Sequence, residues 1–107
     1  MGMKLYWTEF SKKELKTIFN FYKDKVNIVT SKKIIENIVD SVEVLVIYPE
    51  IGMIDPKLSK NQSKIRFIIS TNYKILYKIN NDKNKIEILD IFDIRQNPNK
   101  IARNIMN

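Results

Sequence analysis

The apolar residues of this 107-residue chain change their spacing once, near Pro49, and this change limits the folds that the chain can adopt. Over most of the chain before Pro49 they recur three and four residues apart, as along one face of an α-helix. From residue 65 onward they alternate with polar residues, as in a β-strand. The order predicts an α+β fold, a two-layer sandwich in which helices cover one face of an antiparallel sheet.

The first helix is expected to begin at Ser11. In FSKKEL, residues 10–15, Ser11 and Glu14 have the spacing of a capping box, and Phe10 and Leu15 have that of a hydrophobic staple. The apolar face that follows consists of Leu15, Ile18, Phe19, Tyr22 and Val26. We expect this face to point into the core.

A second helix is expected after a break near Asn27. It should end at Tyr48, because Pro49 disfavours helical geometry in the residue before it. Its apolar face consists of Ile35, Ile38, Val39, Val42, Leu45 and Val46. The short connection makes the helices an antiparallel hairpin. Ahead of them, residues 3–7 are short and apolar and should form a first strand, in which Trp7 packs.

The second half predicts a three-stranded meander. After a turn-rich loop over residues 49–63, the segments 65–70 and 73–79 alternate in polarity and form a hairpin. Their odd-numbered residues are expected to face the helices, which would make Tyr73 and Tyr77 packing residues. A turn over residues 80–84 leads to residues 85–92, which are apolar on both faces and suit an interior strand. A short helical tail is expected after Pro98.

Length and composition favour a single domain over residues 1–107. No apolar run reaches the roughly 18 to 20 residues of a membrane span, and the first residues lack the apolar stretch of a signal peptide, so we expect a cytoplasmic protein. Cysteine and histidine are absent. Thiolate catalysis, disulfides and the usual transition-metal ligands are thereby excluded, and we expect no cofactor and no metal.

Positive charge is concentrated in the second half of the chain. Lysines and arginines outnumber acids by 19 to 12, and Asp82 is the only acid between Lys57 and Lys85. Such a segment either attracts nucleic acid or an acidic protein, or it keeps the face and edges of a sheet soluble. The expected strands put a basic, partly apolar docking surface on the face opposite the helices or at its rim, formed by Arg66, Ile68, Lys74, Leu76 and Lys78.

A series of short motifs follows the order of these elements. They are Trp7 and FSKKEL at the first helix, YPEIG after the second, IRFI and NYKILYKI as paired strands, and ILDIFDIRQNP as the last strand. In order and spacing they resemble the RelE/ParE superfamily of toxins from bacterial type II toxin-antitoxin systems, and the similarity covers nearly the whole chain.

This resemblance implies a small basic protein that is encoded beside an antitoxin and arrests bacterial growth when free. Members of the ParE branch, the plasmid-stabilisation toxins, act on DNA gyrase. Members of the RelE branch are ribosome-dependent mRNA endonucleases that use arginines, lysines and a tyrosine. In both branches the antitoxin lays an extended, partly helical segment over the toxin and blocks it.

Two arginines match positions at which the family carries basic residues. Arg66 stands on the first strand of the meander, and Arg95 stands just beyond the last. The candidate residues for binding a target or partner are therefore Lys64, Arg66, Lys74, Lys78 and Arg95. Both arginines also have a plain structural interpretation: Arg66 is then a solvated strand residue, and Arg95 pairs with Asp93 or Asp90 in solvent.

The RNase branch also carries a tyrosine shortly after its terminal arginine, and residues 96–101, QNPNKI, contain none. RNA cleavage needs groups that take up and return a proton, in addition to positive charge on the phosphorane. The chain is therefore closer to the ParE branch, with catalytic residues unassigned. The alternatives are a RelE-like endonuclease with a non-standard acid and base, and an inert relative that only binds an antitoxin.

Overall fold

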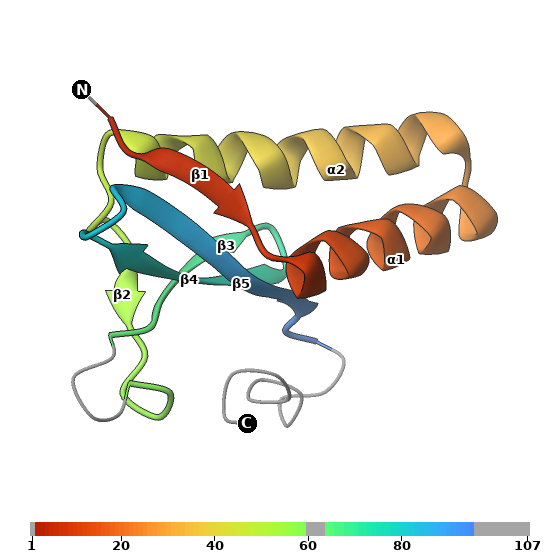
Figure 1. Ribbon diagram of the computed structural model, residues 1–107. Helices are drawn as coiled ribbons and strands as arrows, with labels where there is room; N and C mark the ends of the chain where they lie inside the picture. Colours follow the sequence, from red (N-terminus) through yellow and green to blue (C-terminus); the bar gives the residue numbers. More distant parts are fainter. Residues whose placement is uncertain (1, 60–63, 96–107) are drawn as a thin grey trace.

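The computed structural model describes residues 2–59 and 64–95, and in this part of the chain two antiparallel helices cover one face of a five-stranded sheet (Figure 1). The sheet order is β1-β5-β4-β3-β2. The predicted α+β sandwich is thus confirmed, whereas the tail expected after Pro98 lies outside the described residues. The elements are β1 Lys4–Trp7, α1 Glu9–Lys25, α2 Ile28–Glu43, the 3₁₀ turn η1 Val44–Val46, β2 Met53–Ile54, β3 Arg66–Ser70, β4 Tyr73–Asn80 and β5 Lys85–Asp93.

Helix α1 begins two residues before the predicted start, because Thr8 rather than Ser11 is its N-cap. The Thr8 hydroxyl accepts a hydrogen bond from the Ser11 N–H at 3.2 Å and donates one to the Ile88 carbonyl at 2.7 Å. Ser11 is buried in the first turn, where its hydroxyl donates to the Thr8 carbonyl at 2.9 Å. The cap therefore also fixes α1 to β5, a contact that local spacing does not encode.

The helix hairpin follows the prediction except at its tip and its end. Asn27 caps α2 by accepting a hydrogen bond from the Thr30 N–H, but the neighbouring Val26, expected in the core, is 56% exposed because α1 ends at Lys25. Helix α2 gives way to η1 after Glu43, five residues before the predicted end. No helix among the described residues is long and apolar enough to cross a membrane.

Strand β5 is the interior strand that its two apolar faces predict. It runs parallel to β1 and antiparallel to β4, and a bulge interrupts its pairing with β4. The chain between β1 and β5 comprises the helix hairpin and strands β2, β3 and β4, so the parallel pair joins the first and last strands of the sheet. Strand β2, within the predicted 49–63 loop, was not expected and pairs with β3 at the sheet edge.

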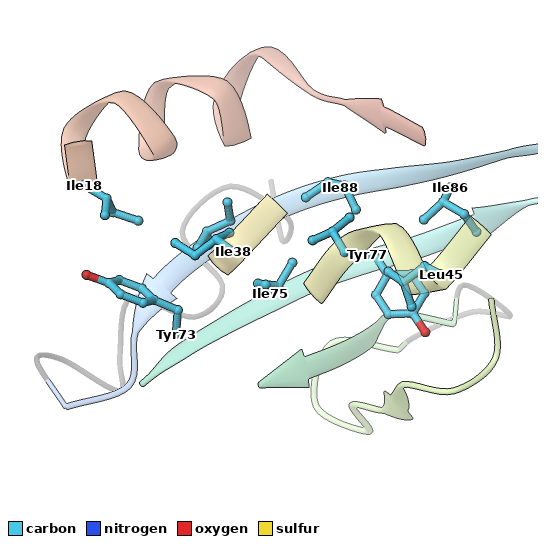
Figure 2. Close-up of a cluster of buried hydrophobic side chains, with 10 residues drawn as sticks. Ile18, Ile38, Leu45, Tyr73, Ile75, Tyr77, Ile86 and Ile88 are labelled. Atoms are coloured by element: carbon cyan, nitrogen blue, oxygen red, sulfur yellow. The ribbon is translucent and has the colours of Figure 1, made fainter. Parts of the chain in front are cut away.

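The main core lies between the helices and the sheet (Figure 2). Tyr73, Ile75 and Tyr77 of β4 face the helices as predicted, but β3 has the opposite phase. Ile68 points to the helices, whereas Phe67 packs on the other face and Ile69 is 48% exposed. The two-residue turn explains this phase, since it pairs even-numbered residues of β3 with odd-numbered residues of β4, and paired residues share a face.

The face opposite the helices is partly covered and is not the open basic surface that we expected. A second apolar cluster lies there, in which Leu58 from the loop after β2 shields residues of the sheet. Leu76, expected to be open to a partner, is fully buried in this cluster. The other members of the cluster are Ile65, Phe67, Leu89 and Phe92.

Candidate functional site

The five candidate basic residues lie at three separate places. Lys64, Arg66 and Lys78 line one cleft of about 530 Å³, whereas Lys74 belongs to the covered face and Arg95 lines a second cleft beside α1. We call the first the basic cleft; its lining residues are Glu50, Lys64, Arg66, Lys78, Ile79, Asn80, Asn81 and Asp82. The structure thus brings three of the five together.

Arg66 anchors the loop that follows η1. Because it pairs with Tyr77 across the strands, its side chain lies on the helix side of the sheet, not on the opposite face as predicted. Its Nη1 donates to the carbonyl oxygens of Gly52 at 2.9 Å and Glu50 at 3.3 Å. The guanidinium therefore fixes one wall of the basic cleft while it contributes charge to it.

Tyr77 of β4 holds the same loop through its buried hydroxyl. Its hydroxyl donates to the Pro49 carbonyl at 2.7 Å and accepts from the Gly52 N–H at 2.9 Å, and its side chain is fully buried. Burial raises the pKa of the Tyr77 hydroxyl, which the Gly52 N–H and the Arg66 charge partly oppose. We call the contacts of Tyr77 and Arg66 with this loop the loop clamp. Tyr77 is thus a packing residue, as predicted, with a structural hydroxyl.

Two lysines inside the one-sided segment, Lys74 and Lys78, form ion pairs with acids outside it. Lys74 lies 3.2 Å from the Asp55 carboxylate, with side-chain exposures of 15% and 8%, and 4.2 Å from the centre of the Phe67 ring. Lys78 lies 3.7 Å from Glu87 across the sheet. The charge excess seen along the sequence is therefore smaller on the folded surface, and Lys74 is largely shielded.

Arg95 lies at the far end of the sheet in a cleft of about 400 Å³ that we call the Arg95 cleft. Its Nε and Nη2 donate to the two oxygens of Asp93 at 3.1 and 3.0 Å, and its side chain remains 65% exposed. These hydrogen bonds lower the pKa of the Asp93 carboxyl. The expected pairing with Asp93 is thus present, and it leaves the guanidinium accessible. The other lining residues are Glu14, Thr17, Ile18, Phe21, Tyr22, Tyr73, Ile91 and Phe92.

Two tyrosines reach the Arg95 cleft from distant parts of the sequence. The Tyr73 hydroxyl donates to the Tyr22 hydroxyl at 3.2 Å. Burial, followed by this hydrogen bond, raises the pKa of Tyr73. Sequence reasoning assigned both tyrosines to the core and missed that their polar ends meet beside Arg95. The sequence contained one signal for this contact: Tyr22 and Tyr73 both have polar ends, and both were expected to face the helix–sheet interface.

The two clefts occupy opposite ends of β4. In Figure 2 the hydroxyl oxygens of Tyr73 and Tyr77 lie at opposite ends of the apolar cluster. These tyrosines are four positions apart in the sequence, which corresponds to roughly 13 Å along a strand. Since Arg66 pairs with Tyr77 and Asp93 pairs with Tyr73, the charges of Arg66 and Arg95 belong to different sites.

Apolar side chains are exposed along the loop that the loop clamp supports. They adjoin β2, a two-residue strand at the edge of the sheet. We call this surface the apolar edge; it consists of Ile47, Tyr48, Ile51, Met53 and Ile54, which are 41 to 70% exposed. Exposed apolar residues at the edge of a sheet are typical of protein-binding surfaces.

Solved structures with the same fold come from toxin-antitoxin systems. A chain of the chromosomal ParDE system from P. aeruginosa has a TM-score of 0.70 at 22% identity, with 85% of this chain and 95% of that chain covered. A chain of the RelBE2 toxin-antitoxin complex from Mycobacterium tuberculosis has a TM-score of 0.65 at 14% identity, with 87% and 99% covered. The free E. coli toxin RelE, as a double arginine-to-alanine mutant, has a TM-score of 0.57 at 12% identity, with 99% and 96% covered.

These identities establish the fold, and the family follows from the sequence. No curated protein sequence matches the chain significantly. The sequence model described as the ParE toxin of the type II toxin-antitoxin system parDE, however, matches residues 5–98, which is most of the chain. The resemblance to the ParE branch is thereby confirmed, and the chain belongs to the ParE toxin family of type II toxin-antitoxin systems.

Proposed function

We propose that this protein arrests bacterial growth by binding a cellular target protein such as DNA gyrase, and that a cognate antitoxin neutralises it. The proposed place of action is the cytoplasm, because gyrase acts there. Arg66 and Arg95, together with Lys64 and Lys78, are the proposed contact residues. Lys74 is largely shielded by its ion pair with Asp55, so we propose that it contributes to target binding indirectly, by holding Asp55 in place.

The observation that carries this proposal is the separation of the basic side chains. Cleavage of RNA would require positive charge, a base and an acid within reach of one phosphate. Arg66 and Arg95 instead line different clefts at the two ends of β4. Two separated charges beside an exposed apolar edge suit the broad surface of a protein partner better than a single scissile bond.

A ribosome-dependent mRNA endonuclease is the second candidate, and the tyrosine pair beside Arg95 is the observation that favours it. Tyr22 and Tyr73 supply hydroxyls that the sequence after Arg95 lacks. The raised pKa of Tyr73 opposes a role as general base, because a tyrosine that holds its proton more firmly accepts one less readily at neutral pH. We therefore rank this candidate second.

Induction of the protein alone in bacteria separates the candidates. We expect growth arrest with altered plasmid supercoiling and a DNA-damage response while translation continues. Rapid loss of protein synthesis with cleaved mRNA would replace the gyrase proposal with the endonuclease. Unimpaired growth would contradict both and favour a relative that only binds an antitoxin.

Two arginine variants test the contact residues. Arg66→Ala and Arg95→Ala should each reduce growth arrest in cells that contain equal amounts of folded protein. Lys16→Ala is the matched control, since Lys16 is an exposed cation of α1 that lines neither cleft. Full growth arrest by both arginine variants would remove these residues from the proposed contact surface.

A further inference from the structure

The Arg95 cleft combines hydrogen-bond donors with apolar walls. Of the Arg95 guanidinium, Nε and Nη2 bind the Asp93 carboxylate, so this ion pair does not use Nη1, and the Tyr22 hydroxyl lies close enough to the guanidinium to add to the rise in the pKa of Arg95 that Asp93 causes. The Tyr22 oxygen accepts the hydrogen of Tyr73, which leaves the hydrogen of Tyr22 for another acceptor. The cleft therefore offers two neutral or cationic donors to one incoming oxygen group.

The geometry of these donors is held by the fold. The Asp93 carboxylate, which hydrogen-bonds the guanidinium, raises the pKa of Arg95, and the Tyr22 hydroxyl adds to this effect. Asp93 is itself buried, at 8% exposure, and pairs with Tyr73 in the sheet. Arg95 is thus oriented by a buried carboxylate while 65% of its side chain is open to solvent. A pre-oriented donor loses less side-chain entropy when it binds.

The apolar wall comes from α1 and β5. Phe21 is 47% exposed and packs edge-on against Tyr22, with 5.1 Å between the ring centres. Ile18 and Phe92 form further parts of the wall. A volume of about 400 Å³ has room for one or two amino-acid side chains, and it lies within the usual range of ligand pockets.

The charges around the cleft distinguish a carboxylate ligand from a polyanion. Of the described residues that line the cleft, Arg95 is the one cation, three carry hydroxyls (Thr17, Tyr22 and Tyr73), and Glu14 adds a carboxylate. A string of phosphates would meet the Glu14 carboxylate, whereas a single carboxylate can bind Arg95 and Tyr22 alone. The net charge of the chain, +7, attracts an acidic partner over longer range.

We propose that the Arg95 cleft binds one Asp or Glu carboxylate of the antitoxin, with the adjoining apolar side chain of the antitoxin seated against Phe21 and Ile18. The proposal rests on the proposed neutralisation by an antitoxin, and it names the chemistry by which this happens at one end of the toxin. When the antitoxin occupies the cleft it covers Arg95, so the target can no longer reach a residue that is proposed to bind it.

The test uses blocked tetrapeptides and the full-length protein, so its outcome does not depend on toxicity in cells. Acetyl-Leu-Leu-Glu-Leu-amide and its Gln counterpart are titrated while NMR follows the Tyr22 ring and the Arg95 Nε–H. We expect saturable shifts at both groups with the Glu peptide, and binding about fivefold weaker with the Gln peptide, because a charged acceptor is lost.

Two variants and one competing ligand complete the test. Arg95→Gln and Tyr22→Phe should each weaken binding of the Glu peptide, whereas Lys16→Gln, which removes the same charge outside the cleft, should not. Equal affinity for the two peptides, or no shift at Tyr22 and Arg95, would overturn the proposal. Tighter binding of hexauridylate than of the Glu peptide at the same two groups would overturn it in favour of RNA.

Discussion

Tyr73 and Tyr77 lie on the same face of the same strand, and yet their hydroxyls act in different ways. The Tyr77 hydroxyl bonds two backbone groups and is enclosed by the loop that it holds. The Tyr73 hydroxyl bonds another side chain, Tyr22, at the edge of an open cleft. A hydroxyl that pairs with buried backbone is needed for the fold, whereas one that pairs with an accessible side chain leaves a donor for a ligand.

The same contrast holds for the arginine at each end of β4. Arg66 donates to the backbone carbonyls of Glu50 and Gly52, so its charge is part of the loop clamp. Arg95 is held by side chains, chiefly the Asp93 carboxylate, and its own side chain remains 65% exposed. We therefore expect changes near Tyr77 to alter stability first, and changes near Tyr73 to alter binding first.

The largest loss of stability is expected for Gly52→Ala. The added Cβ would lie 2.5 Å from the Tyr77 hydroxyl and 2.7 Å from the backbone carbonyl of Phe67, which cannot move aside without disturbing β3. We expect a loss of about 3 kcal/mol in the free energy of unfolding, measured by urea denaturation. Lys16→Ala is the control: Lys16 is an exposed residue of α1 outside the loop clamp, so we expect a change within about 0.5 kcal/mol. Equal effects would show that the loop clamp is not rigid.

Next in size is the difference between Tyr77→Phe and Tyr73→Phe. The first leaves the Pro49 carbonyl and the Gly52 N–H without their buried partner, and should lower the free energy of unfolding by about 1 to 3 kcal/mol. The second frees only Tyr22, which solvent can reach, and should lower it by about 0.5 kcal/mol. Urea denaturation at neutral pH measures both. If Tyr73→Phe proved the more destabilising, the contrast between the two hydroxyls would be wrong.

At neutral pH the Tyr77 hydroxyl is expected to matter more for stability, but at alkaline pH Tyr73 should account for more of the loss of stability. The pKa of each is raised in the folded protein, so above about pH 10 the unfolded chain releases protons that the folded chain keeps, and stability falls as pH rises. The Gly52 N–H and Arg66 oppose the effect of burial on the pKa of Tyr77, whereas a second hydroxyl adds to it at Tyr73. Tyr73→Phe should therefore remove more of the decline than Tyr77→Phe, measured between about pH 9 and 11.

Much of this fold follows from local patterns in the sequence. The change of spacing near Pro49 predicts both layers, and the two apolar faces of residues 85–92 correctly predict an interior strand. The sequence could also have predicted which residues of β3 face the helices, because a two-residue turn cannot put odd-numbered residues of both strands on one face. That error moved Arg66 to the wrong side of the sheet.

The candidate site depends on contacts that spacing along the chain does not contain. The Thr8 cap is selected by a hydrogen bond to Ile88, eighty residues away. Lys74 is neutralised by Asp55, which reaches it from the loop after β2. The meeting of Tyr22 with Tyr73 beside Arg95 requires the packing of α1 on the sheet. Composition could therefore predict a basic surface, but not which cations stay accessible.

The smallest effect is expected for Arg95→Gln, and it is the most informative about the open end of β4. In the folded protein the hydrogen bonds from Arg95 lower the pKa of Asp93, so Asp93 contributes stability above about pH 3.9, and this contribution is lost as pH falls through its lower folded pKa. Arg95→Gln should weaken that acid decline and lower the free energy of unfolding at neutral pH by the same amount, which we expect to be small because the arginine side of the ion pair is exposed. Urea denaturation between about pH 2 and 7, with Lys16→Gln as the charge-matched control, measures both effects. A marked loss of stability at neutral pH would mean that Arg95 supports the fold as Arg66 does, and the contrast between the two ends of β4 would then fail.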